Sequence, residues 1–121
     1  MKSISELMTI IKAHPDYHRV GMVLYHNGVV RGTSRDGRKV SGLKVSVDHE
    51  RLRKVLEVQR KRPGITEILV EIDEGTDLAV GDDVMFIVVA GDIRENVIAS
   101  LTDTLNTIKT TVTHKTEYFQ E

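Results

Sequence analysis

The sequence predicts an α+β domain in which the elements follow the order α-β-β-α-β-β-α-β and the helices cover one side of a mixed, mostly antiparallel sheet. Three kinds of observation support this prediction. Apolar residues recur with helical spacing in segments that begin at capping residues, and β-branched apolar runs lie between these segments. Glycine and proline mark the connections. A length of 121 residues suits a single domain spanning residues 1–121.

The first helix is predicted from a capping box near the start of the sequence. The hydroxyl of Ser3 can accept a hydrogen bond from the backbone N–H of Glu6, whose carboxylate can reach back to the Ser3 N–H. Apolar residues then follow at positions 4, 7, 8 and 11, which share one helical face. Pro15 cannot continue a helix, so we expect the helix to end near Ala13.

Two strands and a basic loop are predicted next. The run "RVGMVLYHN" (19–27) is apolar and β-branched, which indicates a strand that ends in a glycine turn. The following "GVVRGTSRDGRK" (28–39) has three glycines and four basic residues, which is typical of a loop. In "KVSGLKVSVD" (39–48) the alternation slips at Ser41 and Gly42, and this slip predicts a bulge in a half-buried strand.

The middle of the chain alternates between helix and strand. Asp48 is a predicted N-cap of a helix that runs through Arg62 and stops at a Pro-Gly pair. "ITEILVEID" (65–73) then returns as a strand, and "GTDLAVGDD" is predicted to be a turn. "VMFIVVAG" (84–91) is apolar at nearly every position, which predicts a central strand buried on both faces.

The last helix and strand are predicted from the final third of the sequence. Asp92 and Glu95 form a second potential capping box, from which an apolar stripe with helical spacing runs to about Lys109. The β-branched run "TTVTHKTEYF" (110–119) is predicted to be the final strand.

Composition excludes several classes of function. The chain has no cysteine, which rules out disulfides, thiolate metal sites and cysteine nucleophiles. Its net charge of -1 and its 4% of aromatic residues argue against nucleic-acid binding through overall positive charge or base stacking. No apolar run approaches the roughly 18 to 20 residues that span a bilayer. We therefore expect a cytoplasmic protein that binds neither nucleic acid nor membrane.

The histidine pattern does not predict a metal site. His14 and His18 have i, i+4 spacing, but Pro15 lies between them and breaks the helix that would align them. His26 and His114 lie in or at the ends of predicted strands, and we interpret them as partly buried, hydrogen-bonded side chains. We expect neither a metal nor a cofactor.

Two basic segments are candidates for binding an anion. In the loop, Arg31, Arg35, Arg38 and Lys39 lie near glycines, where guanidinium groups and bare backbone N–H donors can reach a phosphate. A solvated hairpin loop is the simpler interpretation of this pattern. The helical segment "ERLRKVLEVQRKR" (50–62) mixes basic with acidic residues, which favours a solvated surface, with an acidic docking partner as the alternative.

A pair of lysines near the end of the sequence has no such simple interpretation. Lys109 and Lys115 have the same parity, so on one continuous strand they would share a face but lie about 20 Å apart. At that distance they could not meet at one small molecule. A shared pocket requires Lys109 to belong to the end of the helix, or the segment between the lysines to bend.

The order of these segments resembles one known family. "GVVR" resembles a G-x-V-R motif after a first long strand, "LAVGDDVMFIVVAGDIRENVIASLTDTLNTIKT" resembles a segment that ends in a lysine, and "HKTE" resembles the W-K-x-E that follows. Together they resemble the MoaE family, the large, catalytic subunit of molybdopterin synthase, from about Val20 to Phe119. The resemblance implies an α/β-hammerhead-like fold.

The same resemblance implies a partner, a substrate and site residues. In this family a homodimer binds two copies of a ubiquitin-like small subunit of the MoaD type, forming a heterotetramer. The C-terminal Gly-Gly thiocarboxylate of the small subunit gives sulfur to cyclic pyranopterin monophosphate, also called precursor Z. The implied catalytic residues are Lys109 and Lys115, and the implied substrate-binding residues are Arg31 and Arg94, with Arg35 and Arg38 from the same loop as Arg31.

The chain also departs from the family pattern. Ile93-Arg94 stands where His-Arg is usual, and Asp73-Glu74 stands about where another His-Arg is common. These departures leave a second hypothesis open, in which the chain is a non-catalytic, dimeric binding or regulatory module that retains part of the anion pocket.

Overall fold

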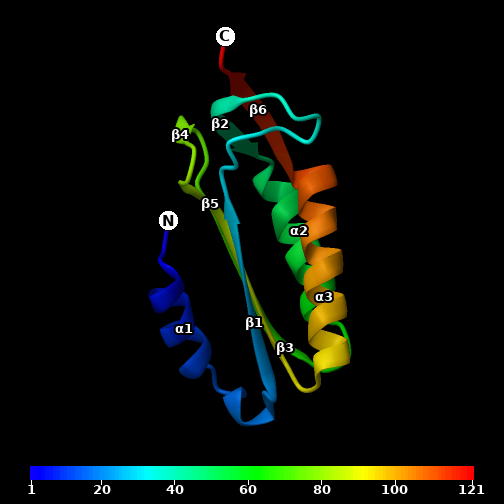
Figure 1. Ribbon diagram of the computed structural model, residues 1–121. Helices are drawn as coiled ribbons and strands as arrows, with labels where there is room; N and C mark the ends of the chain where they lie inside the picture. The colour runs from blue at the N-terminus through cyan, green and yellow to red at the C-terminus, as the bar shows by residue number, and fades with distance from the viewer.

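The elements follow the predicted order along the chain, except that the segment predicted to be a turn contains a two-residue strand, Leu78–Ala79 (Figure 1). The α+β class is confirmed. The computed structural model describes residues 1–121. Its helices are α1 (Ile4–Lys12), α2 (His49–Arg60) and α3 (Arg94–Thr107), with a 3₁₀ turn η1 (Tyr17–Arg19) and a π-helical turn η2 (Ile108–Val112). Its strands are β1 (Met22–Val29), β2 (Val40–Val47), β3 (Ile65–Ile72), β4 (Leu78–Ala79), β5 (Asp83–Gly91) and β6 (Thr113–Phe119). None of the helices is long and apolar enough to cross a membrane.

The strands form two antiparallel sheets instead of the single sheet that the sequence predicted. One sheet has the order β1-β5-β3 and the other has the order β4-β2-β6. β5 is the central strand of the first sheet, as predicted, and its residues 85–90 are all buried. β2 does not pair with β1. The loop between them leads into the second sheet, where β2 pairs with β6 and Val47 lies opposite Thr113. The predicted bulge is confirmed by a register shift between Val40 and Gly42.

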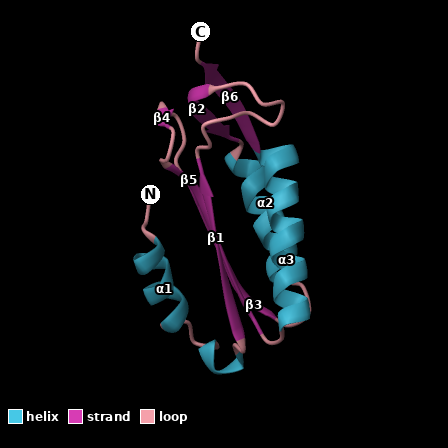
Figure 2. Cartoon of the chain, in the orientation of Figure 1, coloured by secondary structure: helices cyan, strands magenta, loops and turns pink.

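The helices lie on both sides of the β1-β5-β3 sheet, so the expectation that they cover one side was wrong (Figures 1 and 2). Alternate side chains of β5 point to opposite faces. Phe86, Val88 and Ala90 pack with buried residues of α1. Met85, Ile87 and Val89 pack with α3 and with residues of α2. A strand that is apolar on both faces requires cover on both, and α1 supplies the second layer.

Two of the three predicted N-caps are confirmed. Ser3 and Glu6 form the capping box of α1, and Asp48 accepts a hydrogen bond from the Arg51 N–H at the start of α2. The capping box predicted at Asp92 and Glu95 was wrong. Asp92 accepts hydrogen bonds from the adjacent Ile93 N–H and from the side chain of Asn96, so it lies one position too early to cap α3.

The chain leaves α3 through the π-helical turn η2, and β6 begins at Thr113 instead of the predicted position 110. Threonines surround this turn. The Thr111 hydroxyl donates to the Thr107 carbonyl at 2.7 Å, and the Thr113 hydroxyl donates to the Ile108 carbonyl at 3.3 Å. Threonine hydroxyls that bond to preceding carbonyls compete with regular helical hydrogen bonds. We infer that this competition favours the wider turn, since Ile108 and Val112 anchor it by burial.

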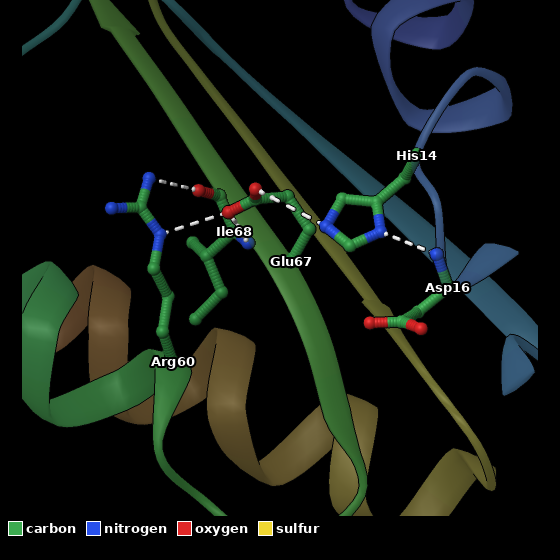
Figure 3. A network of polar contacts seen from close by, with 5 residues as sticks. All are labelled: His14, Asp16, Arg60, Glu67 and Ile68. Carbon is green, nitrogen blue, oxygen red and sulfur yellow. Dashed lines mark hydrogen bonds and ion pairs between the residues drawn. The ribbon is translucent and has the colours of Figure 1, made fainter.

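A network of polar contacts joins the two helical layers around the edge strand β3 (Figure 3). The Arg60 Nε of α2 donates to Glu67 Oε1 at 2.8 Å, and the same side chain donates to the Ile68 carbonyl at 2.8 Å. On the other side, His14 Nε2 lies 3.7 Å from Glu67 Oε2. The ring is oriented because its Nδ1 accepts from the Asp16 N–H at 3.0 Å. Glu67 therefore connects α2 with the segment that follows α1.

Candidate anion-binding site

A cavity of about 420 Å³ lies where the two sheets meet. β1 and β5 of one sheet contribute to its wall, as do β2 and β6 of the other, together with the β1–β2 loop and η2. The residues that line it are His26, Gly28, Val29, Arg31, Thr33, Arg35, Leu43, Val45, Val84, Met85, Lys109, Thr113, Lys115 and Glu117.

The strand β6 presents every second side chain to this cavity. Thr113, Lys115 and Glu117 share one face, and in the register Lys115 lies opposite Val45 of β2. Val45 and its neighbour Leu43 are buried in a small apolar cluster beneath this face. The aliphatic side chains thus form a floor, and the polar side chains of β6 stand beside it.

Lys109 reaches the same cavity from the π-helical turn. It lies between the buried Ile108 and Val112, which fix the backbone of the turn while the amine remains exposed. No hydrogen bond or ion pair holds the amine. Lys109 and Lys115 therefore line one cavity, because η2 replaces the extended segment that would have separated them by about 20 Å.

The β1–β2 loop supplies two arginines to the cavity. The Arg31 Nε donates to the carbonyl of Thr33 at 2.7 Å, which orients the guanidinium and leaves its other N–H groups free for a ligand. Arg35 also lines the cavity and forms no ion pair. Sequence reasoning selected both residues, although a solvated loop was the simpler interpretation of the pattern.

The cavity is strongly cationic compared with the whole molecule. Four of its lining side chains are cations, and the one carboxylate, Glu117, lies 3.7 Å from the amine of Lys115. The complete chain carries a formal charge of -1, so this positive charge is local. Convergent cations and N–H donors of this kind bind phosphate and carboxylate groups and stabilise negative charge that develops during a reaction.

His26 is a lining residue that the sequence analysis did not select. It was expected to be partly buried and hydrogen-bonded, but its Nε2 is buried without any partner. Burial, followed by the positive charge of Lys109, lowers the pKa of His26 below its usual value, so the imidazole is neutral at neutral pH. His26 lies on the same face of β1 as Met22 and Leu24, which face α3, because alternate residues of a strand share a face. This alternation could have indicated its position.

Two predicted site residues lie outside the cavity. Arg94 is at the first turn of α3, whose 14 residues place it about 20 Å from the helix end that leads to Lys109. Its side chain is 79% exposed and pairs with Glu95 at 3.3 Å. The guanidinium of Arg38 lies 3.6 Å from the centre of the Phe119 ring instead of among the lining residues. The structure thus brings together Arg31, Arg35, Lys109 and Lys115 but not these two arginines.

The fold and cavity define a small α+β protein with a cationic cavity between two antiparallel sheets. The family model described as "MoaE protein" matches residues 2–111, and the chain belongs to this family. No curated protein sequence is similar enough to count as a match. The family places the chain in molybdenum cofactor biosynthesis, as a large subunit of molybdopterin synthase.

Solved structures support the fold. The chain is similar to molybdopterin synthase from Staphylococcus aureus, with 21% identity, a TM-score of 0.73, and coverage of 85% of this chain and 77% of that chain. For molybdopterin cofactor biosynthesis protein E from Burkholderia multivorans the identity is 20%, the TM-score 0.77, and the coverage 98% and 82%. A complex of subunits 1 and 2 of molybdopterin-converting factor from Helicobacter pylori contains a chain with 15% identity, a TM-score of 0.71, and coverage of 99% and 85%.

Proposed function

We propose that this chain is the sulfur-inserting subunit of a molybdopterin synthase. It would take sulfur from the C-terminal thiocarboxylate of a small, ubiquitin-like subunit and transfer it to cyclic pyranopterin monophosphate. Each transfer forms a C–S bond to a carbon of the pterin side chain, which gives up a C–O bond, and breaks the acyl C–S bond of the small subunit, where water restores a carboxylate on the tail. The whole reaction takes place between anions.

The convergence of Arg31, Arg35, Lys109 and Lys115 on one cavity carries this proposal. Both the thiocarboxylate and the pterin phosphate are negatively charged, and like-charged reactants require fixed positive charge to approach each other. The four cations come from three separate segments of the chain, so a run of basic sequence does not account for their meeting.

The positions of the cations support a division of roles. Arg31, oriented by Thr33, and Arg35 each bring a planar guanidinium group rich in N–H donors to the cavity, and such groups suit the phosphate of the pterin. Lys109 has no protein partner and is free to hold the thiocarboxylate and to move protons during transfer. Lys115 is held by Glu117 on the cavity face of β6 and adds a second amine to the same site.

The partner and the assembly are part of the proposal. The Helicobacter pylori structure is a complex of two subunits, and by analogy a MoaD-type small subunit would bring its Gly-Gly tail to the cavity. The proposal also includes a homodimer within a heterotetramer, by analogy with the family. Arg94, which lies outside the cavity of its own chain, would then be available to a neighbouring subunit. The cytoplasmic location remains a prediction from the sequence.

Reconstitution tests this function directly. The purified chain is mixed with a thiocarboxylated small subunit and precursor Z, and molybdopterin is measured. We expect product, and we expect none when the small subunit carries an ordinary carboxylate. Absence of product under conditions in which another large subunit is active would reject sulfur transfer by this chain.

A non-catalytic binding module is the second candidate, and the position of Ile93 favours it. This residue is 54% exposed and has no imidazole to offer where the family usually has a histidine. Such a module would bind the thiocarboxylated tail or the pterin phosphate without forming product. Calorimetry measures whether each ligand binds, and the reconstitution assay measures whether product forms. Binding without product supports the module, and binding with product supports the transferase.

A further inference from the structure

The arginine hairpin (residues 33–39) is folded through its own backbone, and few contacts attach it to the rest of the protein. Thr33 and Lys39 form an antiparallel bridge at its base. The Ser34 N–H donates to the Arg38 carbonyl at 2.9 Å, and the Gly37 N–H donates to the Ser34 carbonyl at 3.0 Å. These bonds shape the hairpin, but they do not determine where it lies over the cavity.

The hairpin is attached to β6 by the side chain of Arg38. Its guanidinium lies over the ring of Phe119, 3.6 Å from the ring centre. Alternation along β6 places Phe119 on the same face as Lys115 and Glu117, so the ring continues the row of side chains that line the cavity. A backbone hydrogen bond from Gln120 N–H to the Lys39 carbonyl, at 3.0 Å, reinforces this junction.

We propose that Arg38 is a positioning residue, which by stacking on Phe119 holds the arginine hairpin against β6 and keeps Arg35 over the cavity. The inference rests on the proposed anion site but not on sulfur transfer. The guanidinium of Arg38 forms no salt bridge, and it stacks on Phe119. After the hydrogen bond from Ser34, its charge is one of the smaller causes that lower the pKa of the Asp36 carboxyl in the same hairpin. A cation over an aromatic face at an exposed position is a weak interaction, so its loss should have a small effect on ligand binding.

A double-mutant cycle with inorganic phosphate as the probe tests this inference. Arg38→Met removes the cation and retains the length of the side chain, and Phe119→Leu removes the ring and retains an apolar residue in the strand. We expect each change to raise the dissociation constant for phosphate by about two- to fivefold. NMR titration measures this constant. The double variant should be no weaker than the single variants, because either change already breaks the stack.

Tyr118→Phe is the matched control. Tyr118 is the neighbour of Phe119 on the opposite face of β6 and bonds to Asp77 at 2.9 Å, so its loss should leave phosphate affinity unchanged. Hydrogen exchange of the Gln120 amide, which donates to the Lys39 carbonyl at the junction of the hairpin with β6, should accelerate in both stack variants and not in the control. Additive losses, or weaker binding in Arg38→Met alone, would mean that Arg38 contacts the anion directly and would overturn the inference. Unchanged affinity in both stack variants would also overturn it, whether or not the protein transfers sulfur.

Discussion

Two groups of charged side chains in this protein differ in whether their charges are neutralised within the chain. Around β3, the carboxylate of Glu67 lies between Arg60 at 2.8 Å and His14 at 3.7 Å (Figure 3). In the cavity, Arg31 and Lys109 have no carboxylate partner. The first group joins elements of the fold, and the cations of the second group are available to pair with an anion that binds in the cavity.

The difference indicates what each group is for. A cation paired with a carboxylate stabilises the fold modestly and retains little field for a ligand. Unpaired cations that share one cavity repel each other, so their convergence contributes nothing favourable to folding. A cavity that gathers such cations in a chain of net charge -1 is therefore best explained by an anionic ligand that offsets the repulsion when it binds.

Removal of the Lys109 amine should have the largest effect. Lys109→Met retains the aliphatic part of the side chain, and we expect sulfur transfer to fall by roughly 10²- to 10⁴-fold, the range in which a positioned proton-transfer group contributes. The melting temperature should not fall, because the amine has no partner in the folded chain. Lys54→Met is the control, since Lys54 pairs with Glu50 on the exposed face of α2. Equal activity of the two variants would exclude Lys109 from the reaction.

Loss of the Arg31 guanidinium should weaken substrate binding more than turnover. Arg31→Met removes charge-assisted hydrogen bonds to the phosphate, and we expect the KM for the pterin to rise about ten- to a hundredfold with a smaller change in kcat. Added salt should raise the KM of the wild-type protein, because salt screens the attraction between the Arg31 guanidinium and the phosphate. The variant lacks this attraction, so added salt should change its KM less. A variant whose kcat falls while its KM is unchanged would place Arg31 at the reacting atoms instead.

Breaking the network at β3 should affect stability and leave binding intact. Glu67→Ala removes the partner of both Arg60 and His14, and we expect a loss of about 1–2 kcal/mol in the free energy of unfolding, discounted because these side chains are partly exposed. Glu57→Ala, which breaks the exposed pair with Arg53, should cost only about 0.3–0.5 kcal/mol. Urea denaturation measures both values. Equal losses would show that the network around Glu67 stabilises the fold no more than an exposed surface ion pair does.

The same contrast explains which features the sequence could predict. The order of the elements, the caps at Ser3 and Asp48, and the bulge near Gly42 depend on local patterns, and all were confirmed apart from the short strand β4, which lies in a predicted turn. The split into two sheets and the position of α1 depend on pairing between distant segments, which periodicity does not encode.

The candidate site follows the same rule. Lys109 and Lys115 could share a cavity only if the chain between them was not extended, and the π-helical turn meets that condition. Sequence propensity does not predict such a turn, because it depends on the burial of Ile108 and Val112 as well as on the surrounding threonines. His26 was missed for a related reason, since its position in the cavity depends on the packing of β1 against the end of α3.

The smallest expected effect concerns the coupling between Lys109 and His26. Burial lowers the pKa of His26 first, and repulsion from the Lys109 amine lowers it further, so Lys109→Met should raise this pKa only part of the way toward its ordinary value. NMR titration of the His26 ring proton measures the change. Below the ordinary value of about 6.5, the unfolded chain binds a proton at this ring that the folded chain resists. The free energy of unfolding should therefore decrease as the pH drops from the ordinary pKa of histidine to the lowered pKa of folded His26. Lys109→Met should make this decrease smaller. If the titration of His26 were identical in both proteins, the imidazole would not sense the amine, and the electrostatic coupling within the cavity would have to be rejected.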